Sequence, residues 1–202
     1  AFSANTIPLN HQVTAVNDAP ALKSNATTLA NILEDEVSAG ETVANLFFNT
    51  NFSDAIDAVD GGSIANSLAG VAIVGYTPDA SAGDWQYLDT QGNWQNLSTL
   101  TPPISEENAL IVGATQKLRF LPATDFSGNV PKLDAHLIDD SISVITGDSL
   151  QDSSALRVDL SLPDVTGGTT AYSTQTVSLN HAVTGENDAP VSSGNVSLTA
   201  ID

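Results

Sequence analysis

The sequence predicts an all-β, sandwich-like domain, because short runs that alternate apolar and polar residues recur along the chain. Leu118 and Phe120, for example, alternate with Lys117 and Arg119. Turn-forming stretches rich in Gly, Pro, Asn, Asp and Ser separate such runs about every ten residues, a spacing typical of all-β sandwiches. The 202 residues, of which 41% are hydrophobic, are enough for one or two cores.

A segment of 20 residues occurs twice, as residues 1–20 and 171–190, with 12 identical positions. In each copy an alternating strand pattern runs into Asn-Asp-Ala-Pro, where the proline favours a stiff, extended linker. A repeat at this distance predicts a string of whole domains. We expect residues 1–20 to be the last strand and linker of a preceding repeat, residues 21–190 one domain, and residues 191–202 the linker and start of the next repeat.

The linker sequence Val16-Asn17-Asp18-Ala19-Pro20 resembles the linkers of cadherins and, more closely, the borders of cadherin-like repeats in giant bacterial RTX-type surface adhesins. Further stretches match that family in its order: Phe52-Ser53-Asp54-Ala55 with Asp57, residues 66–71, Gly83-Asp84-Trp85-Gln86-Tyr87, residues 118–122 with 125–128, and residues 167–173. The resemblance implies a cadherin/immunoglobulin-like β-sandwich with long acidic loops, bound Ca²⁺ and a secreted location on a bacterial cell surface.

The net charge of the chain independently predicts that its partner is a cation. The chain has 24 acidic and 5 basic residues, a net charge of −19, which argues against nucleic acid or an anionic membrane as a partner. Cysteine is absent, so neither a disulfide framework nor thiolate chemistry is expected. No apolar run of membrane-spanning length and no signal peptide is visible, so we expect no membrane insertion and an internal piece of a soluble or surface protein.

In chain order, residues 25–33 read as a strand that delivers Glu34-Asp35-Glu36. Adjacent carboxylates repel each other, by about 4 kcal/mol for a pair ~4 Å apart at an effective dielectric of 20. The run is either a solvated acidic turn or, as the resemblance implies, a set of calcium ligands near the Asn17-Asp18 linker. The leading acidic residue of the cadherin linker is replaced by Ala15 and Gly185, which predicts weaker binding.

Residues 40–48 fit either a strand or a short helix. The loop that follows carries Asp54, Asp57 and Asp60 at three-residue spacing before two glycines. It lacks the alternating spacing and closing glutamate of an EF-hand, so a calcium loop and an ordinary polar loop both remain open.

Residues 69–75 are rich in valine and isoleucine, which predicts a buried strand. Trp85, Tyr87 and Trp94 flank a polar turn at residues 89–93, so this segment reads as a hairpin with aromatic cross-strand partners. The aromatic residues are expected either in the core or on a platform for stacking sugars.

In the second half, Leu156, Val158, Leu160 and Leu162 alternate with polar residues and predict a long strand. A strand at residues 133–138 ends in Asp139-Asp140, and Asp148 and Asp152 follow in loops. These acids form either a solubilising surface or a calcium cluster at one end of the domain.

Catalysis has little support in the sequence. The three histidines are His11, His136 and His181, and the first and last share a strand face with leucine, as core histidines do. No nucleophile elbow, phosphate loop or zinc spacing is present, so we expect no enzyme.

The expected calcium ligands combine the two linkers with the acidic stretches: Asn17, Asp18, Glu34, Asp35, Glu36, Asp54, Asp57, Asp139, Asp140, Asn187 and Asp188. The residues expected near a ligand are Asp60, Asp139, Asp140, Asp148 and Asp152.

Two functions are open. The first is a calcium-dependent module that binds a C-terminal or other peptide, or a glycan, on a target cell. The second is a spacer between tandem repeats that calcium stiffens.

Overall fold

The computed structural model describes residues 8, 11, 15–59, 63–142 and 157–189, and it confirms the all-β prediction. Its elements are β1 (Ala21–Leu22), β2 (Ala26–Thr28), β3 (Ile32–Leu33), β4 (Glu41–Thr42), α1 (Val43–Phe47), β5 (Phe52–Ser53), β6 (Leu68–Gly75), β7 (Gly83–Leu88), β8 (Trp94–Asn96), η1 (Leu97–Thr99), η2 (Glu106–Asn108), β9 (Ala109–Gly113), β10 (Lys117–Pro122), β11 (Gly128–Asn129), β12 (Leu133–Asp139), β13 (Arg157–Val158), β14 (Tyr172–Asn180) and β15 (Ala182–Thr184). None of the helices in the described part of the chain is long and apolar enough to cross a membrane.

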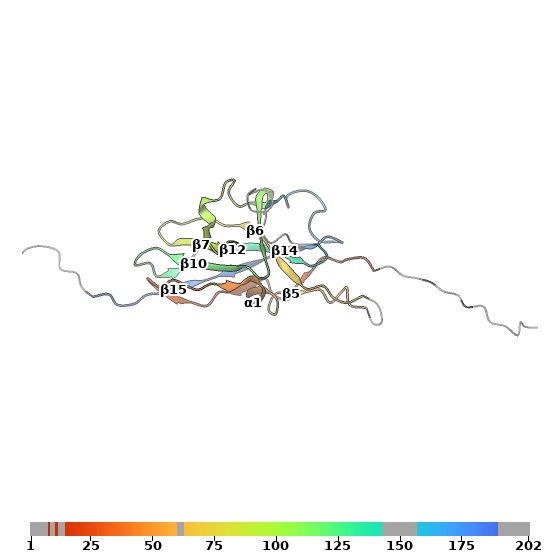
Figure 1. Ribbon diagram of the computed structural model, residues 1–202, viewed down its shortest axis with the longest axis horizontal. Coiled ribbons are helices and arrows are strands. Elements are labelled where there is room, and N and C mark those ends of the chain that lie inside the picture. The colour runs from red at the N-terminus through yellow and green to blue at the C-terminus, as the bar shows by residue number, and fades with distance from the viewer. Residues whose placement is uncertain (1–7, 9–10, 12–14, 60–62, 143–156, 190–202) are drawn as a thin grey trace, which may run out of the picture.

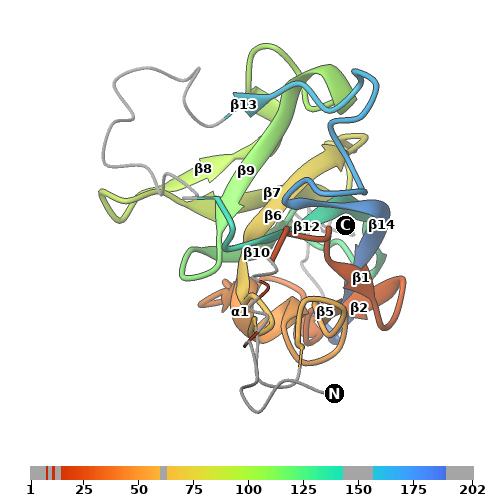
Figure 2. The same ribbon diagram turned by 90° about the vertical axis from the view of Figure 1, so that its right-hand side faces the viewer.

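The strands form four sheets (Figures 1 and 2). The largest has six strands in the order β13-β9-β6-β12-β14-β2, and the second has four in the order β4-β10-β7-β8. The smaller sheets are β11-β15-β3 and β1-β5. In the six-stranded sheet, β6 pairs antiparallel with both β9 and β12, which places the start of β6 beside the end of β12.

The main core lies between the six-stranded and the four-stranded sheet. Val71 and Leu137 contribute from the former, Trp85 and Phe120 from the latter, and all four are fully buried. The Trp85 and Phe120 rings meet edge to face at 5.5 Å, and the indole N–H of Trp85 donates to the Pro131 carbonyl at 2.6 Å. The buried strand predicted at residues 69–75 and the inward-facing Leu118 and Phe120 are therefore confirmed.

The long strand predicted at residues 156–162 is not formed in its described part. Only Arg157–Val158 pair with a neighbour, Leu160 is buried, and Leu162 is 56% exposed. The Asp159 carboxylate accepts both the backbone N–H and the hydroxyl of Ser161. Such a local turn competes with a sheet ladder for the same backbone groups, which is why the alternating pattern misleads here. Leu156 lies outside the described residues.

Two other predictions are refined. Residues 40–48 contain both alternatives, the short strand β4 and then the helix α1, which Thr42 caps by accepting the N–H of Asn45. The hairpin of β7 and β8 is present, but Trp94 pairs with Leu88 rather than with an aromatic residue. The Arg119 guanidinium instead lies over the Trp94 ring, with its central carbon 4.0 Å from the ring centroid.

The chain enters and leaves the domain at opposite ends of its long axis (Figure 1). Residues 15–20 lead into β1, which pairs with β5 at one end, whereas β15 leads to residues 185–189 at the other. The two copies of the repeated histidine differ accordingly. His181 is buried in the core, as predicted, whereas His11 is exposed.

Candidate metal centre at the N-terminal end

The N-terminal linker is docked on the domain by backbone and side-chain hydrogen bonds. The backbone N–H of Asp18 donates to both carboxylate oxygens of Asp57, at 3.0 and 3.2 Å. The next N–H, that of Ala19, donates to the Gly168 carbonyl at 2.8 Å. The linker therefore meets the domain at an acidic side chain.

The Asn17 side-chain amide is surrounded by oxygen atoms. Its nitrogen lies 3.2 Å from the Asp139 carboxylate, 3.1 Å from the Thr170 carbonyl and 3.2 Å from the Asp18 carbonyl. An amide nitrogen has only two hydrogens, so it cannot fully satisfy three acceptors. The Asn17 oxygen accepts from the Asn66 side chain at 2.6 Å.

Three segments that are distant in the sequence bring these groups together. Asp54 and Asp57 occupy the turn after β5, and Asn66 precedes β6. Asp139 is the last residue of β12, and its register partner is Leu68 at the start of β6. The antiparallel pairing of β6 with β12 thus places Asn66 and Asp139 at one end of the domain.

Asp54 is the most perturbed carboxyl group of this cluster. The side chain is only 3% exposed, and one oxygen accepts the backbone N–H of Asn66 at 2.6 Å. The other oxygen is buried and has no hydrogen-bond partner. Burial is the main cause that raises the pKa of Asp54 to about 6; the nearby charges of Asp57 and Asp139 contribute to the rise, and the Asn66 hydrogen bond opposes it.

Asp57 and Asp139 are also buried, with 7% and 0% exposure. One Asp139 oxygen accepts the backbone N–H of Ser141 at 2.9 Å and also its hydroxyl. A cavity of about 160 Å³ opens beside the cluster and is lined in part by Asn17, Asp57 and Asn66. Three buried carboxylates thus share one end of the domain, next to a space large enough for small solvent species.

The donor set fits a hard cation. Carboxylate, amide and carbonyl oxygens are the ligands that Ca²⁺ takes, six to eight at a time. Within the described ranges, no group of three or more His, Cys, Asp or Glu side chains is already arranged around one point as a metal site. Most of these carboxylate oxygens face N–H donors instead, so an ion would require Asn17 and the aspartates to reorient. The orphaned Asp54 oxygen is the atom best placed to gain a ligand.

The run Glu34-Asp35-Glu36 lies at the other end of the domain, and not near Asn17-Asp18 as expected. Glu34 accepts the backbone N–H of Glu186, just before the second linker. Asp35 accepts the N–H of Asp125 at 3.4 Å, and Glu36 accepts that of Leu33 at 3.2 Å. The three carboxylates therefore accept hydrogen bonds from three different backbone N–H groups. Asp35 has a positive φ of 63°, so the chain turns between Glu34 and Glu36.

The remaining candidates divide into exposed and undescribed residues. Asp140 is exposed, and its carboxylate accepts the Ser67 N–H at 2.9 Å at the edge of the N-terminal cluster. Asn187 and Asp188 are exposed, unlike their docked counterparts Asn17 and Asp18. Asp60, Asp148 and Asp152 lie outside the described residues.

Asn66 and Thr170 are parts of the cluster that sequence reasoning did not select. Asn66 stands directly before a predicted buried strand, and Thr170 contributes only its backbone carbonyl. Knowing that β6 and β12 pair antiparallel would have placed Asn66 beside Asp139, but the sequence gives no register. A backbone carbonyl carries no residue-type signal at all.

We compared the chain with protein-family models, curated proteins and solved structures, and no match was found in any of the three.

Proposed function

We propose that this chain is a β-sandwich repeat of a bacterial cell-surface adhesin, stiffened by calcium at the junctions between tandem copies. The observation that supports this best is the orphaned, buried oxygen of Asp54 in a cluster that also holds the linker. The ligands would be the carboxylates of Asp54, Asp57 and Asp139 together with the side-chain oxygen of Asn17. The chain would then be secreted and exposed on the cell surface.

The electrostatics of the cluster favour a cation over empty space. Two like charges ~4 Å apart repel by about 4 kcal/mol at an effective dielectric of 20, and burial adds a desolvation penalty for each. A divalent ion replaces these repulsions with attractions. The overall charge of −19 raises the local concentration of cations around the domain in addition.

The duplicated linker supports a tandem arrangement. Asn187-Asp188-Ala189-Pro190 repeats Asn17-Asp18-Ala19-Pro20 in sequence. Unlike Asn17 and Asp18, Asn187 and Asp188 are exposed. A following copy of the domain would offer Asn187 and Asp188 the same acidic cluster that Asn17 and Asp18 contact here. Calcium bound there would fix the angle between the two domains.

The alternative, a binder whose open calcium ion is held by Asp139 and Asp140, has less support. The Asp139 carboxylate is fully buried and already accepts hydrogen bonds from Asn17 and Ser141. An ion at that position would be enclosed by protein rather than open to a peptide or a glycan. The stiffening role is therefore the one that the geometry favours.

Small-angle X-ray scattering of residues 15–190 joined directly to residues 21–189 tests this proposal, because Asn187 and Asp188 then take the place of Asn17 and Asp18 in the second copy. With millimolar Ca²⁺ we expect an extended particle with a narrow distance distribution, and with excess chelator a shorter and broader one. Replacing both Asn187 and Asp188 by alanine in the first copy should keep the particle in the chelated form even with calcium. Glu107→Gln, an exposed charge on η2, is the matched control.

Equal dimensions with and without calcium in the unsubstituted protein would contradict the proposal. Circular dichroism of each sample shows whether both domains stay folded, so that a change in particle shape can be assigned to the junction alone.

A further inference from the structure

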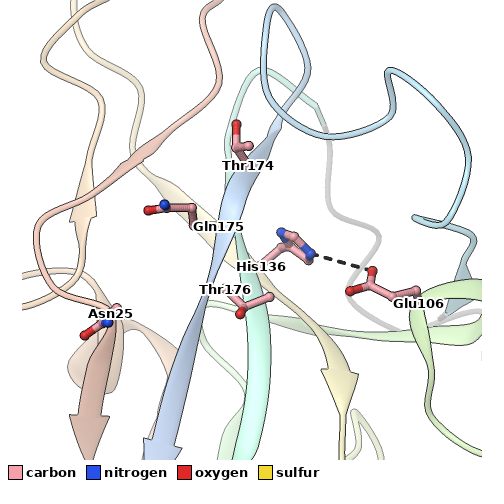
Figure 3. Close-up of a pocket in the computed structure, with 6 residues that line it drawn as sticks. All are labelled: Asn25, Glu106, His136, Thr174, Gln175 and Thr176. Atoms are coloured by element: carbon pink, nitrogen blue, oxygen red, sulfur yellow. Dashed lines mark ion pairs between the residues drawn. The ribbon is translucent and has the colours of Figure 1, made fainter.

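A polar cleft lies over the outer face of the six-stranded sheet (Figure 3). It has a volume of about 420 Å³, and its lining consists of polar side chains: Asn25, Glu106, His136, Thr174, Gln175 and Thr176. His136 comes from β12 and Glu106 from η2, so the cleft joins two segments distant in sequence.

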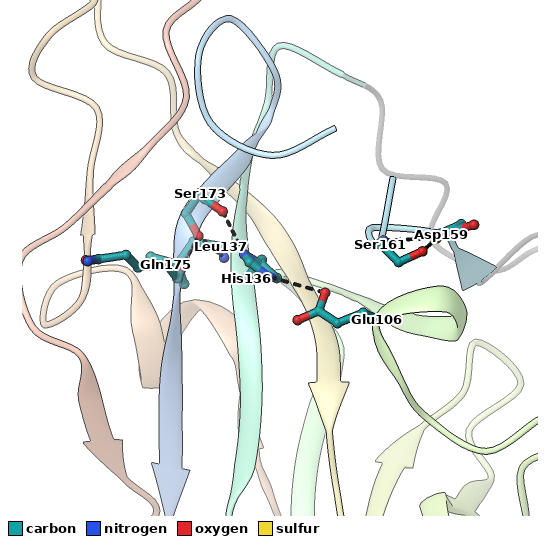
Figure 4. A network of polar contacts seen from close by, with 7 residues as sticks. All are labelled: Glu106, His136, Leu137, Asp159, Ser161, Ser173 and Gln175. Atoms are coloured by element: carbon teal, nitrogen blue, oxygen red, sulfur yellow. Dashed lines mark hydrogen bonds and ion pairs between the residues drawn. The ribbon is translucent and has the colours of Figure 1, made fainter. Parts of the chain in front are cut away.

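The His136 ring is held in a fixed orientation and tautomer. Its Nδ1 lies 2.6 Å from the Ser173 carbonyl, which can only accept, so Nδ1 carries the hydrogen. Ser173 is itself fully buried, and its hydroxyl accepts the Leu137 N–H at 2.9 Å and donates to the Gln175 carbonyl at 2.7 Å (Figure 4). The His136 side chain is only 6% exposed, and its second nitrogen points towards Glu106 in the cleft.

That second nitrogen, Nε2, faces the carboxylate of Glu106. The distance from Nε2 to the Glu106 oxygen is 3.7 Å, which is longer than a hydrogen bond. In the neutral tautomer, Nε2 presents a lone pair to another acceptor, an arrangement that a cation between the two groups stabilises. Backbone support of Nδ1 with a free Nε2 is the arrangement that metal-binding histidines adopt.

We propose that His136 and Glu106 bind a divalent transition-metal ion of the Zn²⁺ type at the mouth of this cleft. Zinc ligands at about 2.0 to 2.2 Å in tetrahedral geometry stand about 3.4 Å apart. The Glu106 side chain is 50% exposed, so a small rotation closes the difference from 3.7 Å. Water and the hydroxyl and amide oxygens of the cleft complete the coordination.

This site is chemically distinct from the proposed calcium centre. An imidazole nitrogen suits Zn²⁺, Ni²⁺ or Cu²⁺, whereas Ca²⁺ takes oxygen ligands. The inference does not depend on the proposed function, because saturating the oxygen sites with calcium should leave the His136 site free. Each proposal can therefore fail without the other.

Isothermal titration calorimetry with ZnCl₂ in millimolar Ca²⁺ tests the site. We expect one Zn²⁺ per chain with a micromolar dissociation constant. His136→Ala should weaken binding at least tenfold and Glu106→Gln several-fold. Two matched controls, His11→Ala and Glu107→Gln, remove an exposed imidazole and an exposed carboxylate and should leave the affinity unchanged.

Nitrogen NMR of the imidazoles provides a second measurement that needs no variant, in case His136→Ala does not fold. Zinc should shift the Nε2 resonance of His136 and leave those of His11 and His181 in place. The site is overturned if no zinc binds below millimolar concentration, if His136→Ala binds as tightly as the parent, or if another histidine carries the shift.

Discussion

At the scale of single residues, His181 shows how the core constrains a titratable group. Its ring lies 6.0 Å from that of Trp85 and 5.9 Å from that of Phe120, and Nδ1 faces the Leu29 carbonyl at 3.3 Å. Its Nε2 is buried and has no hydrogen-bond partner. Burial lowers the pKa of His181, so the folded protein keeps this ring neutral.

The pKa of His181 predicts a loss of stability in acid. Below about pH 6.5 the unfolded chain binds a proton at this histidine and the folded chain does not, so the free energy of unfolding falls as pH falls. The loss is at most about 1.4 kcal/mol at one pH unit below 6.5. In His181→Leu this pH-dependent loss in the free energy of unfolding should be absent. Urea unfolding of variant and parent at pH 7.5 and pH 5.5 measures the difference.

The comparison is made between variant and parent at each pH, because the raised pKa of Asp54 acts in the opposite direction. A folded carboxyl group with a raised pKa loses stability as pH increases from about 4 to about 6. Parallel pH dependence of His181→Leu and the parent would show that His181 is not the group responsible.

At the scale of elements, the strand pattern predicts strands that have a partner on each side better than it predicts edges. The segments 69–75 and 133–138 were predicted from their residues and are the central strands β6 and β12. The segment 25–33 was expected as one strand but divides into β2 and β3, which pair in parallel with β14 and β15. At an edge, local turns compete with pairing, and composition does not decide which wins.

The pairing of β7 with β10 depends on a glycine. Gly83 has φ of +126°, and a Cβ atom there would stand 2.2 Å from the Leu121 carbonyl oxygen. Gly83→Ala should therefore lower the free energy of unfolding by about 2 to 4 kcal/mol, through backbone strain and displacement of β10. Thermal or urea unfolding measures the loss.

Gly92→Ala is the matched control for this prediction. Gly92 also has a positive φ, +84°, but no atom lies within 4 Å of the added Cβ. Only the conformational cost of about 1 kcal/mol remains there. Equal losses in the two variants would mean that close approach of the strands is not what requires Gly83.

At the scale of the whole molecule, the sequence predicted which residues form the acidic cluster, but it did not predict that they lie close together in the fold. Asp54, Asp57, Asp139 and the linker pair were selected from their chemistry. That they share one end of the domain follows from the antiparallel register of β6 and β12, which no local pattern encodes. The same reason explains why Glu34 was expected near Asn17-Asp18 but lies near the second linker. Its location depends on the pairing of β3 with β15, which the local sequence does not reveal.

The cleft around His136 was not predicted, for a related reason. His136 lies in the middle of a largely buried strand, and its partner Glu106 lies in a short 3-10 helix. Sequence alone gave no spacing typical of a metal site, because the two ligands come from segments that only the sheet brings together.

The central claim, that the N-terminal acidic cluster binds calcium, is tested most directly by the stability of Asp54→Asn in two media. In chelator at pH 7.5 the variant should be more stable than the parent, by up to about 3 kcal/mol, because it removes a buried charge whose pKa is raised to about 6. With Ca²⁺ at 100 times the dissociation constant this advantage should shrink by up to about 2.7 kcal/mol, because the parent gains that much from the bound ion and the variant has lost a ligand. Glu107→Gln should differ from the parent equally in both media. The calcium site is contradicted if the difference in stability between variant and parent is the same with calcium and with chelator. It is also contradicted if calcium does not change the melting temperature of the parent.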